Sequence, residues 1–138
     1  LCYLVSGCGG YHAKCYSGPE LEKTQVSIIT TDEQFITIGG VDGERIKLTS
    51  SVSLFFNAVF WDGRYPRTVT VLPGNHRILP CYQGPYRAGC ASHWLEIETK
   101  ADQAYIIKYN YGEKKSIEFW IEPQRNSDRT VHQNLLGL

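Results

Sequence analysis

The chain has 138 residues, of which 42% are hydrophobic and 20% charged. It is therefore long enough for one domain with a buried core and too apolar to be disordered. The 14 Lys and Arg balance the 14 Asp and Glu, which excludes the basic surplus of a nucleic-acid binder and any polybasic membrane patch. Met is absent and the first residue is Leu1, so we expect either missing upstream residues or a Leu start codon.

The chain opens with an apolar run, residues 1–5, followed by small residues and Cys8. This order is typical of the end of a secretory signal, where an apolar core precedes small residues at the cleavage site. We expect residues 1–7 to be the end of a signal peptide and residues 8–24 to be a polar tether. The alternative is that residues 1–5 form a first buried strand and that Cys8 is a core thiol.

Val5-Ser6-Gly7-Cys8 resembles the lipobox of bacterial lipoproteins. In that family the Cys is acylated, the bond before it is cut and the Cys becomes the mature N-terminus. The resemblance implies a lipid on Cys8 that holds the protein to a membrane. The residue after Cys8 is Gly9 and not Asp, which implies the outer membrane by similarity to sorting in enteric bacteria.

Cysteine spacing predicts one disulfide. Export favours disulfides because compartments outside the cytoplasm are oxidising. Cys81 and Cys90 flank a turn-rich loop, and a bridge between them would stabilise the protein by roughly 2–3 kcal/mol. Cys2 is expected to leave with the signal, and Cys15 is then left free or paired with one of the others.

Short runs of alternating apolar and polar residues, rich in β-branched side chains, predict strands in the rest of the chain. In chain order they cover residues 25–30, 35–38, 45–48, 53–61, 68–72, 76–82, 93–99, 104–109 and 116–122. Asp42-Gly43, Asp62-Gly63 and Pro73-Gly74-Asn75 predict turns between them. This spacing predicts an all-β fold over residues 25–123, an antiparallel β-sandwich with a small barrel as the alternative, and a tail over residues 124–138.

Five short motifs follow one another as they do in a group of small, mostly uncharacterised lipoproteins of Gram-negative bacteria, which the chain resembles. The motifs are Gln25-Val26-Ser27-Ile28-Ile29, Val41-Asp42-Gly43, Leu72-Pro73-Gly74-Asn75-His76, Ala104-Tyr105-Ile106-Ile107 and Phe119-Trp120-Ile121-Glu122. The chain departs from the group at residues 81–90 and at Asp102-Gln103. The resemblance implies a location in the cell envelope and no particular chemistry.

No catalytic motif is present, neither Gly-x-Ser-x-Gly nor His-Glu-x-x-His nor a phosphate-binding loop, so we expect no enzyme and no cofactor. His76 follows a Pro-Gly-Asn turn and is expected to bond the turn carbonyls.

No metal site is expected either. A zinc site from Cys8, His12 and Cys15 lacks a fourth ligand nearby. Asp42 and Asp62 are explained by Asp-Gly turns without calcium.

Aromatic residues support a binding alternative. Tyr82, Tyr86, His93 and Trp94 lie near the bridged loop and are the candidate contacts for a ligand or partner, whereas Trp120 is expected in the core. The resulting interpretation is a lipid-anchored envelope protein that faces the periplasm. It would have a structural or accessory role in a membrane-associated assembly, an envelope protein as partner and no nucleic acid. The alternative is a module that binds a glycan or a peptide.

Overall fold

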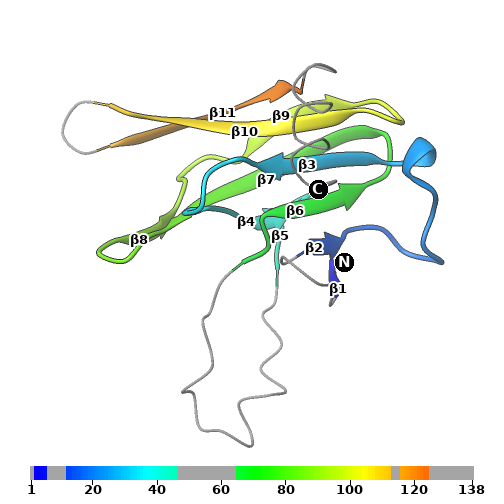
Figure 1. The fold of residues 1–138 in the computed structure, drawn as a ribbon, viewed down its shortest axis with the longest axis horizontal. Coiled ribbons are helices and arrows are strands. Elements are labelled where there is room, and N and C mark those ends of the chain that lie inside the picture. The colour runs from blue at the N-terminus through cyan, green and yellow to red at the C-terminus, as the bar shows by residue number, and fades with distance from the viewer. Residues whose placement is uncertain (1, 6–11, 47–64, 113–115, 125–138) are drawn as a thin grey trace, which may run out of the picture.

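The computed structural model describes residues 2–5, 12–46, 65–112 and 116–124. These residues form two β-sheets that pack against each other, with one short 3-10 helix, η1 (Lys23–Gln25) (Figure 1). The all-β prediction is confirmed. The two sheets do not close on each other, so the sandwich and not the small barrel is the architecture.

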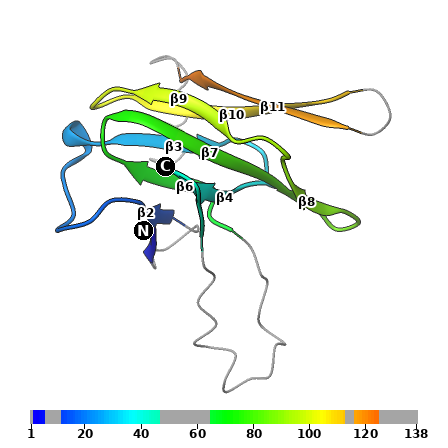
Figure 2. The same cartoon turned by 180° about the vertical axis from the view of Figure 1, so that it is seen from behind.

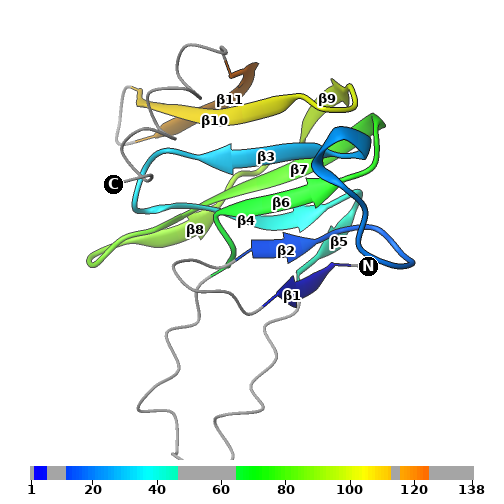
Figure 3. The ribbon, with the colours of Figure 1, turned by 45° about the vertical axis from the view of Figure 1, so that its right-hand side comes forward.

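The first sheet has six strands, and its outer strands come from the two ends of the described chain. Two of its pairs, β2 with β6 and β3 with β10, are parallel and the others are antiparallel. Figure 3 shows the N-terminal edge of this sheet. In spatial order the strands are β1 (Tyr3–Val5), β2 (His12–Lys14), β6 (Thr68–Val71), β3 (Ser27–Thr31), β10 (Ala104–Tyr111) and β11 (Ile117–Pro123).

The second sheet is built around the ten-residue strand β7. One edge of β7 pairs with β4, and the other edge pairs with β9 over residues 74–78 and with β8 over residues 81–83 (Figure 2). All of these pairs are antiparallel. The strands are β5 (Glu44–Arg45), β4 (Ile36–Val41), β7 (Gly74–Gln83), β8 (Ala88–Cys90) and β9 (Leu95–Thr99).

Branched aliphatic side chains from both sheets fill the space between them. The first sheet contributes residues such as Ile29, Val69 and Ile107, and the second contributes Ile36 and Ile78, all of them completely buried. Burying one such side chain is worth about 1.5–3 kcal/mol. The strict alternation of side chains along a strand then sends the neighbours of these residues to the outer faces.

The Asp-Gly turn between β4 and β5 has the predicted conformation. Asp42 has φ 54° and Gly43 has φ 85°, and a two-residue hairpin turn of this kind needs positive φ at both positions. Asp42 also holds the turn to strand β7, because its Oδ1 accepts a hydrogen bond of 3.0 Å from the backbone N–H of Arg77.

Three expectations about the elements are wrong. Residues 12–14 are strand β2 and not tether, since a three-residue strand needs only one core-facing side chain and Ala13 provides it at 0% exposure. Residues 88 and 89 belong to β8, although they were expected to be loop. Trp120 is 41% exposed, because Phe119 and Ile121 face the core and alternation turns Trp120 outward.

The described residues at the N-terminus form one strand and one disulfide. Residues 3–5 form strand β1 beside β2, and Cys2 is bonded to Cys15. Cys8, the predicted strand 53–61, the Asp62-Gly63 turn and the tail from residue 125 lie outside the described residues.

Candidate functional site

The predicted disulfide between Cys81 and Cys90 is present, and it joins two directly opposite residues of β7 and β8. Its sulfur atoms lie against the backbone of Gly39 in β4. A Cβ atom on Gly39 would overlap Cys81 Sγ and come within 3.3 Å of Cys90 Sγ. Glycine at this position therefore lets the disulfide pack flat on the sheet.

An open cleft of about 510 Å³ lies beside this disulfide on the outer face of the five-stranded sheet. We call it the outer-face cleft. Its outward position follows from β7, where Ile78 and Tyr82 point to the core and the alternate residues Leu79, Cys81 and Gln83 line the cleft. The other lining residues are Arg45, Tyr65, Ala88, Gly89, Cys90, Ala91 and Trp94.

Arg45 and Tyr65 form one wall of the cleft. The Arg45 guanidinium carbon lies 6.0 Å from the centre of the Tyr65 ring, and Nη2 donates to Tyr65 Oη at 3.2 Å and to Cys90 Sγ at 3.3 Å. No carboxylate is among the described residues that line the cleft. Within the described part of the chain, Arg45 is thus a positive charge whose hydrogen-bond partners are neutral.

Trp94 forms the other wall and lies over the backbone of β4. A Cβ atom on Gly40 would come within 2.5 Å of the Trp94 ring, so only glycine leaves room for the indole there. Gly40 pairs with Arg45 in β5, and the guanidinium of Arg77 in β7 lies 5.8 Å from the Trp94 ring centre. Because β4 lies between β5 and β7, the indole has an arginine on the strand to either side of it.

A second hollow of about 460 Å³ lies on the same sheet near the other end of β7. It is acidic, because Asp42, Glu96 and Glu98 line it together with Asn75, His76 and Arg77. Both ring nitrogens of His76 have partners there. Its Nδ1 lies 2.8 Å from Asp42 Oδ2 and its Nε2 lies 2.5 Å from the carbonyl oxygen of Leu72, so the ring holds two turns together, as the sequence predicted for the turn after Leu72.

The zinc hypothesis for His12 and Cys15 is excluded in this structure, because Cys15 is oxidised in its disulfide with Cys2. His12 instead contacts the hydroxyl of Thr70. Burial lowers the pKa of His12 below 6.5, and nearby Glu20 opposes that shift. Within the described part of the chain, no group of three metal-ligating side chains gathers.

The four predicted contact residues do not gather in one place. Trp94 lines the outer-face cleft, whereas Tyr82 points to the core side of β7, where its ring packs against Phe35. Tyr86 is 99% exposed at the tip of the β7–β8 loop. His93 is also exposed and does not line the cleft.

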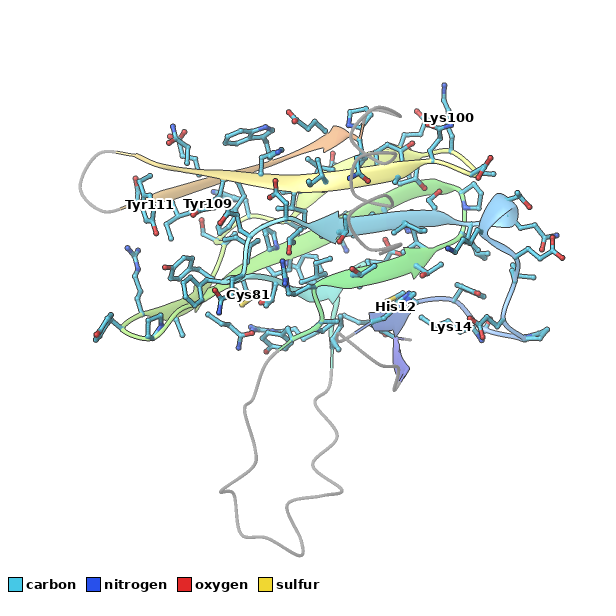
Figure 4. All side chains as sticks on the ribbon, in the orientation of Figure 1. His12, Lys14, Cys81, Lys100, Tyr109 and Tyr111 are labelled. Carbon is cyan, nitrogen blue, oxygen red and sulfur yellow. A yellow bond between two sulfur atoms is a disulfide. The ribbon has the colours of Figure 1, made fainter. Side chains whose placement is uncertain are left out.

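Tyr82 belongs to an aromatic cluster at one end of the sandwich. Its hydroxyl accepts a hydrogen bond of 3.3 Å from Tyr111, and Tyr111 meets Tyr109 edge to face with ring centres 5.5 Å apart (Figure 4). The hydrogen bond to Tyr111 and burial raise the pKa of Tyr82 above 10.0. Burial, followed by the charge of Glu33, raises the pKa of Tyr109.

Sequence reasoning missed Arg45 and Tyr65 of the outer-face cleft. It also missed Gly39 and Gly40, on which the disulfide and Trp94 lie. The available signal was the Gly39-Gly40 pair directly after the predicted strand 35–38, since glycine in a strand marks a close approach by another group and β4 extends through both residues. The group itself was not identifiable, because Tyr65, Cys81 and Trp94 are distant in sequence.

Comparisons with protein-family models, with curated proteins and with solved structures found no match to this chain. The described residues contain no helix that is long and apolar enough to cross a membrane.

Proposed function

We propose that this protein is an accessory protein of the bacterial cell envelope that acts outside the cytoplasm. The observation that carries the proposal is the Cys81–Cys90 disulfide in a small β-sandwich. Disulfides of this kind persist in oxidising compartments and are rare in the cytosol. The role is to bind or support other envelope components, and the engagement of both His76 ring nitrogens supports leaving catalysis out of it.

The proposed attachment to the outer membrane is a lipid on Cys8, and it rests on the Val5-Ser6-Gly7-Cys8 sequence. This attachment and the Cys2–Cys15 disulfide exclude one another in one mature molecule, because cleavage before Cys8 removes Cys2. The Cys2–Cys15 pair therefore belongs to the uncleaved chain, and Cys15 would lose this partner in the mature protein.

Peptide mapping of the protein isolated from Gram-negative cells, without reduction, tests both parts. We expect Cys81 joined to Cys90, an acylated Cys8 at the mature N-terminus, and recovery in the outer-membrane fraction. Cys8→Ser should move the protein to the soluble fraction. Cys2→Ser is the matched control and should leave it on the membrane.

Two results would contradict the proposal. Free thiols at Cys81 and Cys90 in the isolated protein would remove the argument for an oxidising compartment. An intact Cys2–Cys15 peptide, or membrane association of the Cys8→Ser variant, would rule out the lipid anchor.

A second candidate function is that of a ligand-binding module, and the outer-face cleft favours it. The cleft has a volume of about 510 Å³, inside the range of 300–1,000 Å³ that is typical of small-molecule sites. Arg45 comes from β5 and the floor of the cleft from β7 and the Cys81–Cys90 disulfide, which suits a preformed site. Tyr65 and Trp94 lie in the segments just before β6 and β9.

A further inference from the structure

We propose that the outer-face cleft binds an acidic oligosaccharide, with Arg45 on a sugar carboxylate and with Tyr65 and Trp94 against the faces of the sugar rings. This inference deepens the second candidate function and does not depend on how the protein is attached to a membrane.

Arg45 supplies the charge selectivity. A guanidinium carries five N–H donors in a planar fork that matches a carboxylate. Among the described residues, Arg45 donates to two neutral acceptors, Tyr65 Oη and Cys90 Sγ, and no carboxylate in that part of the chain lines the cleft. The hydrogen bonds to Tyr65 and Cys90 orient the fork before a ligand arrives, so less entropy is lost on binding.

Tyr65 and Trp94 supply flat apolar surfaces at fixed positions. The backbone N–H of Tyr65 donates to Gln83 Oε1 at 2.9 Å, which ties that residue to β7. The Trp94 ring lies over the Gly40 backbone, and the Arg77 guanidinium carbon lies 5.8 Å from the ring centre. The C–H bonds on the apolar face of a pyranose ring are attracted to the negative face of an aromatic ring, so both rings are suited to a sugar.

The neighbouring hollow limits where a second negative charge fits. Asp42, Glu96 and Glu98 line it on the same sheet together with one guanidinium, that of Arg77, and the excess of carboxylates repels an anion that extends along β7. The favoured ligand therefore has its carboxylate at Arg45 and neutral sugar units toward Glu96. A nucleic acid, with one charge on every residue, fits this pattern poorly.

An acidic peptide is the other class of anion with a carboxylate. Peptides that add to a sheet bind along its edge through backbone hydrogen bonds, whereas this cleft lies on the sheet face. The face position and the two aromatic walls favour the sugar.

Calorimetric titration of the full chain, with both disulfides oxidised, tests the inference with three probes. They are a uronic-acid oligosaccharide, a neutral oligosaccharide of the same length and linkage, and an oligoglutamate peptide. We expect the uronic-acid probe to bind at least about 10-fold more tightly than the other two, since a charge-assisted bidentate contact is worth that factor or more.

Matched variants place the binding in the cleft. Arg45→Gln should weaken binding of the uronic-acid probe at least about 10-fold. Arg45→Lys should weaken it less than Arg45→Gln does, and Trp94→Ala should also weaken binding. Lys100→Gln removes a charge far from the cleft, as the positions of Lys100 and Cys81 in Figure 4 show, and should leave binding unchanged. Tyr86→Ala should leave it unchanged as well, because Tyr86 lies outside the cleft.

Several outcomes would overturn the inference. They are equal affinity for the charged and neutral sugars, tighter binding of oligoglutamate, no binding of any probe, or wild-type affinity in the Arg45→Gln variant with its Cys81–Cys90 bond intact. Loss of binding in Tyr86→Ala with no effect of Trp94→Ala would place a site at the loop tip instead. None of these results bears on the disulfide and fractionation experiment above.

Discussion

At Gly39 and Gly40 the absence of a side chain decides how the outer face of the five-stranded sheet is covered. The disulfide lies on Gly39 and the Trp94 indole on Gly40. Neither glycine has a positive φ, so the reason for glycine here is space and not backbone conformation. A methyl group at either position would push a large group off the sheet.

Gly39→Ala is therefore expected to lower the free energy of unfolding by about 1–3 kcal/mol, the usual cost of overpacking. The added Cβ would also increase the fraction of molecules with free thiols at Cys81 and Cys90. Chemical denaturation and thiol labelling measure these two effects. Gly89→Ala is the control in the same cleft, because a Cβ there meets nothing within 4 Å; equal effects of the two substitutions would refute the packing argument.

His76 shows what local sequence predicts about one residue and what it leaves open. Its position after Pro73-Gly74-Asn75 predicts a bond to the turn, and the Leu72 carbonyl is that partner, four residues away. The other partner, Asp42, is 34 residues away in the chain. Only the pairing of β4 with β7 brings the two side chains together.

Strand β11 shows that the alternation of side chains along a strand is predictable, whereas the face that turns to the core is not. Residues 117–123 alternate as expected, but the face that turns to the core holds Phe119 and Ile121 and not Trp120. β11 is the edge strand of its sheet, so a large aromatic residue on its outer side stays partly in solvent. Trp120 there donates its indole N–H to Glu122 at 3.2 Å.

Substitutions on opposite sides of β11 should therefore differ in cost. We expect Phe119→Ala to lower the free energy of unfolding by about 2 kcal/mol or more, because it opens a gap against the core. Trp120→Ala should cost less than about 1 kcal/mol, because the ring is already exposed. Urea denaturation of both variants measures the difference, and a larger loss from Trp120→Ala would mean that β11 presents its other face to the core.

For the molecule as a whole, the shifted pKa values of one histidine and two tyrosines limit the pH range in which the fold is stable, at its acid and its alkaline end. The pKa of His12 is lowered in the folded protein, so the unfolded chain binds more protons and stability falls as the pH drops below about 6.5. The pKa values of Tyr82 and Tyr109 are raised. The folded chain therefore keeps protons that the unfolded chain loses, and stability falls as the pH rises above about 10.

We expect the free energy of unfolding, followed by urea titration across pH, to decline at both ends. His12→Gln should flatten the acid decline and leave the alkaline one in place. Tyr109→Phe should flatten the alkaline decline and leave the acid one in place. If either variant keeps the wild-type slope on its own side, the residue does not contribute to the pH dependence.

The sequence alone determined the all-β class, most strand positions, the Asp42-Gly43 turn and the Cys81–Cys90 pair. These features depend on alternation, turn chemistry and spacings of a few residues, which a single segment carries by itself. Tertiary structure alone decided that Cys2 pairs with Cys15, that Trp120 faces outward, and that Arg45, Tyr65 and Trp94 share one cleft. Each of these depends on which strands become neighbours and which face each strand buries, and that choice is made by the packing of the whole core.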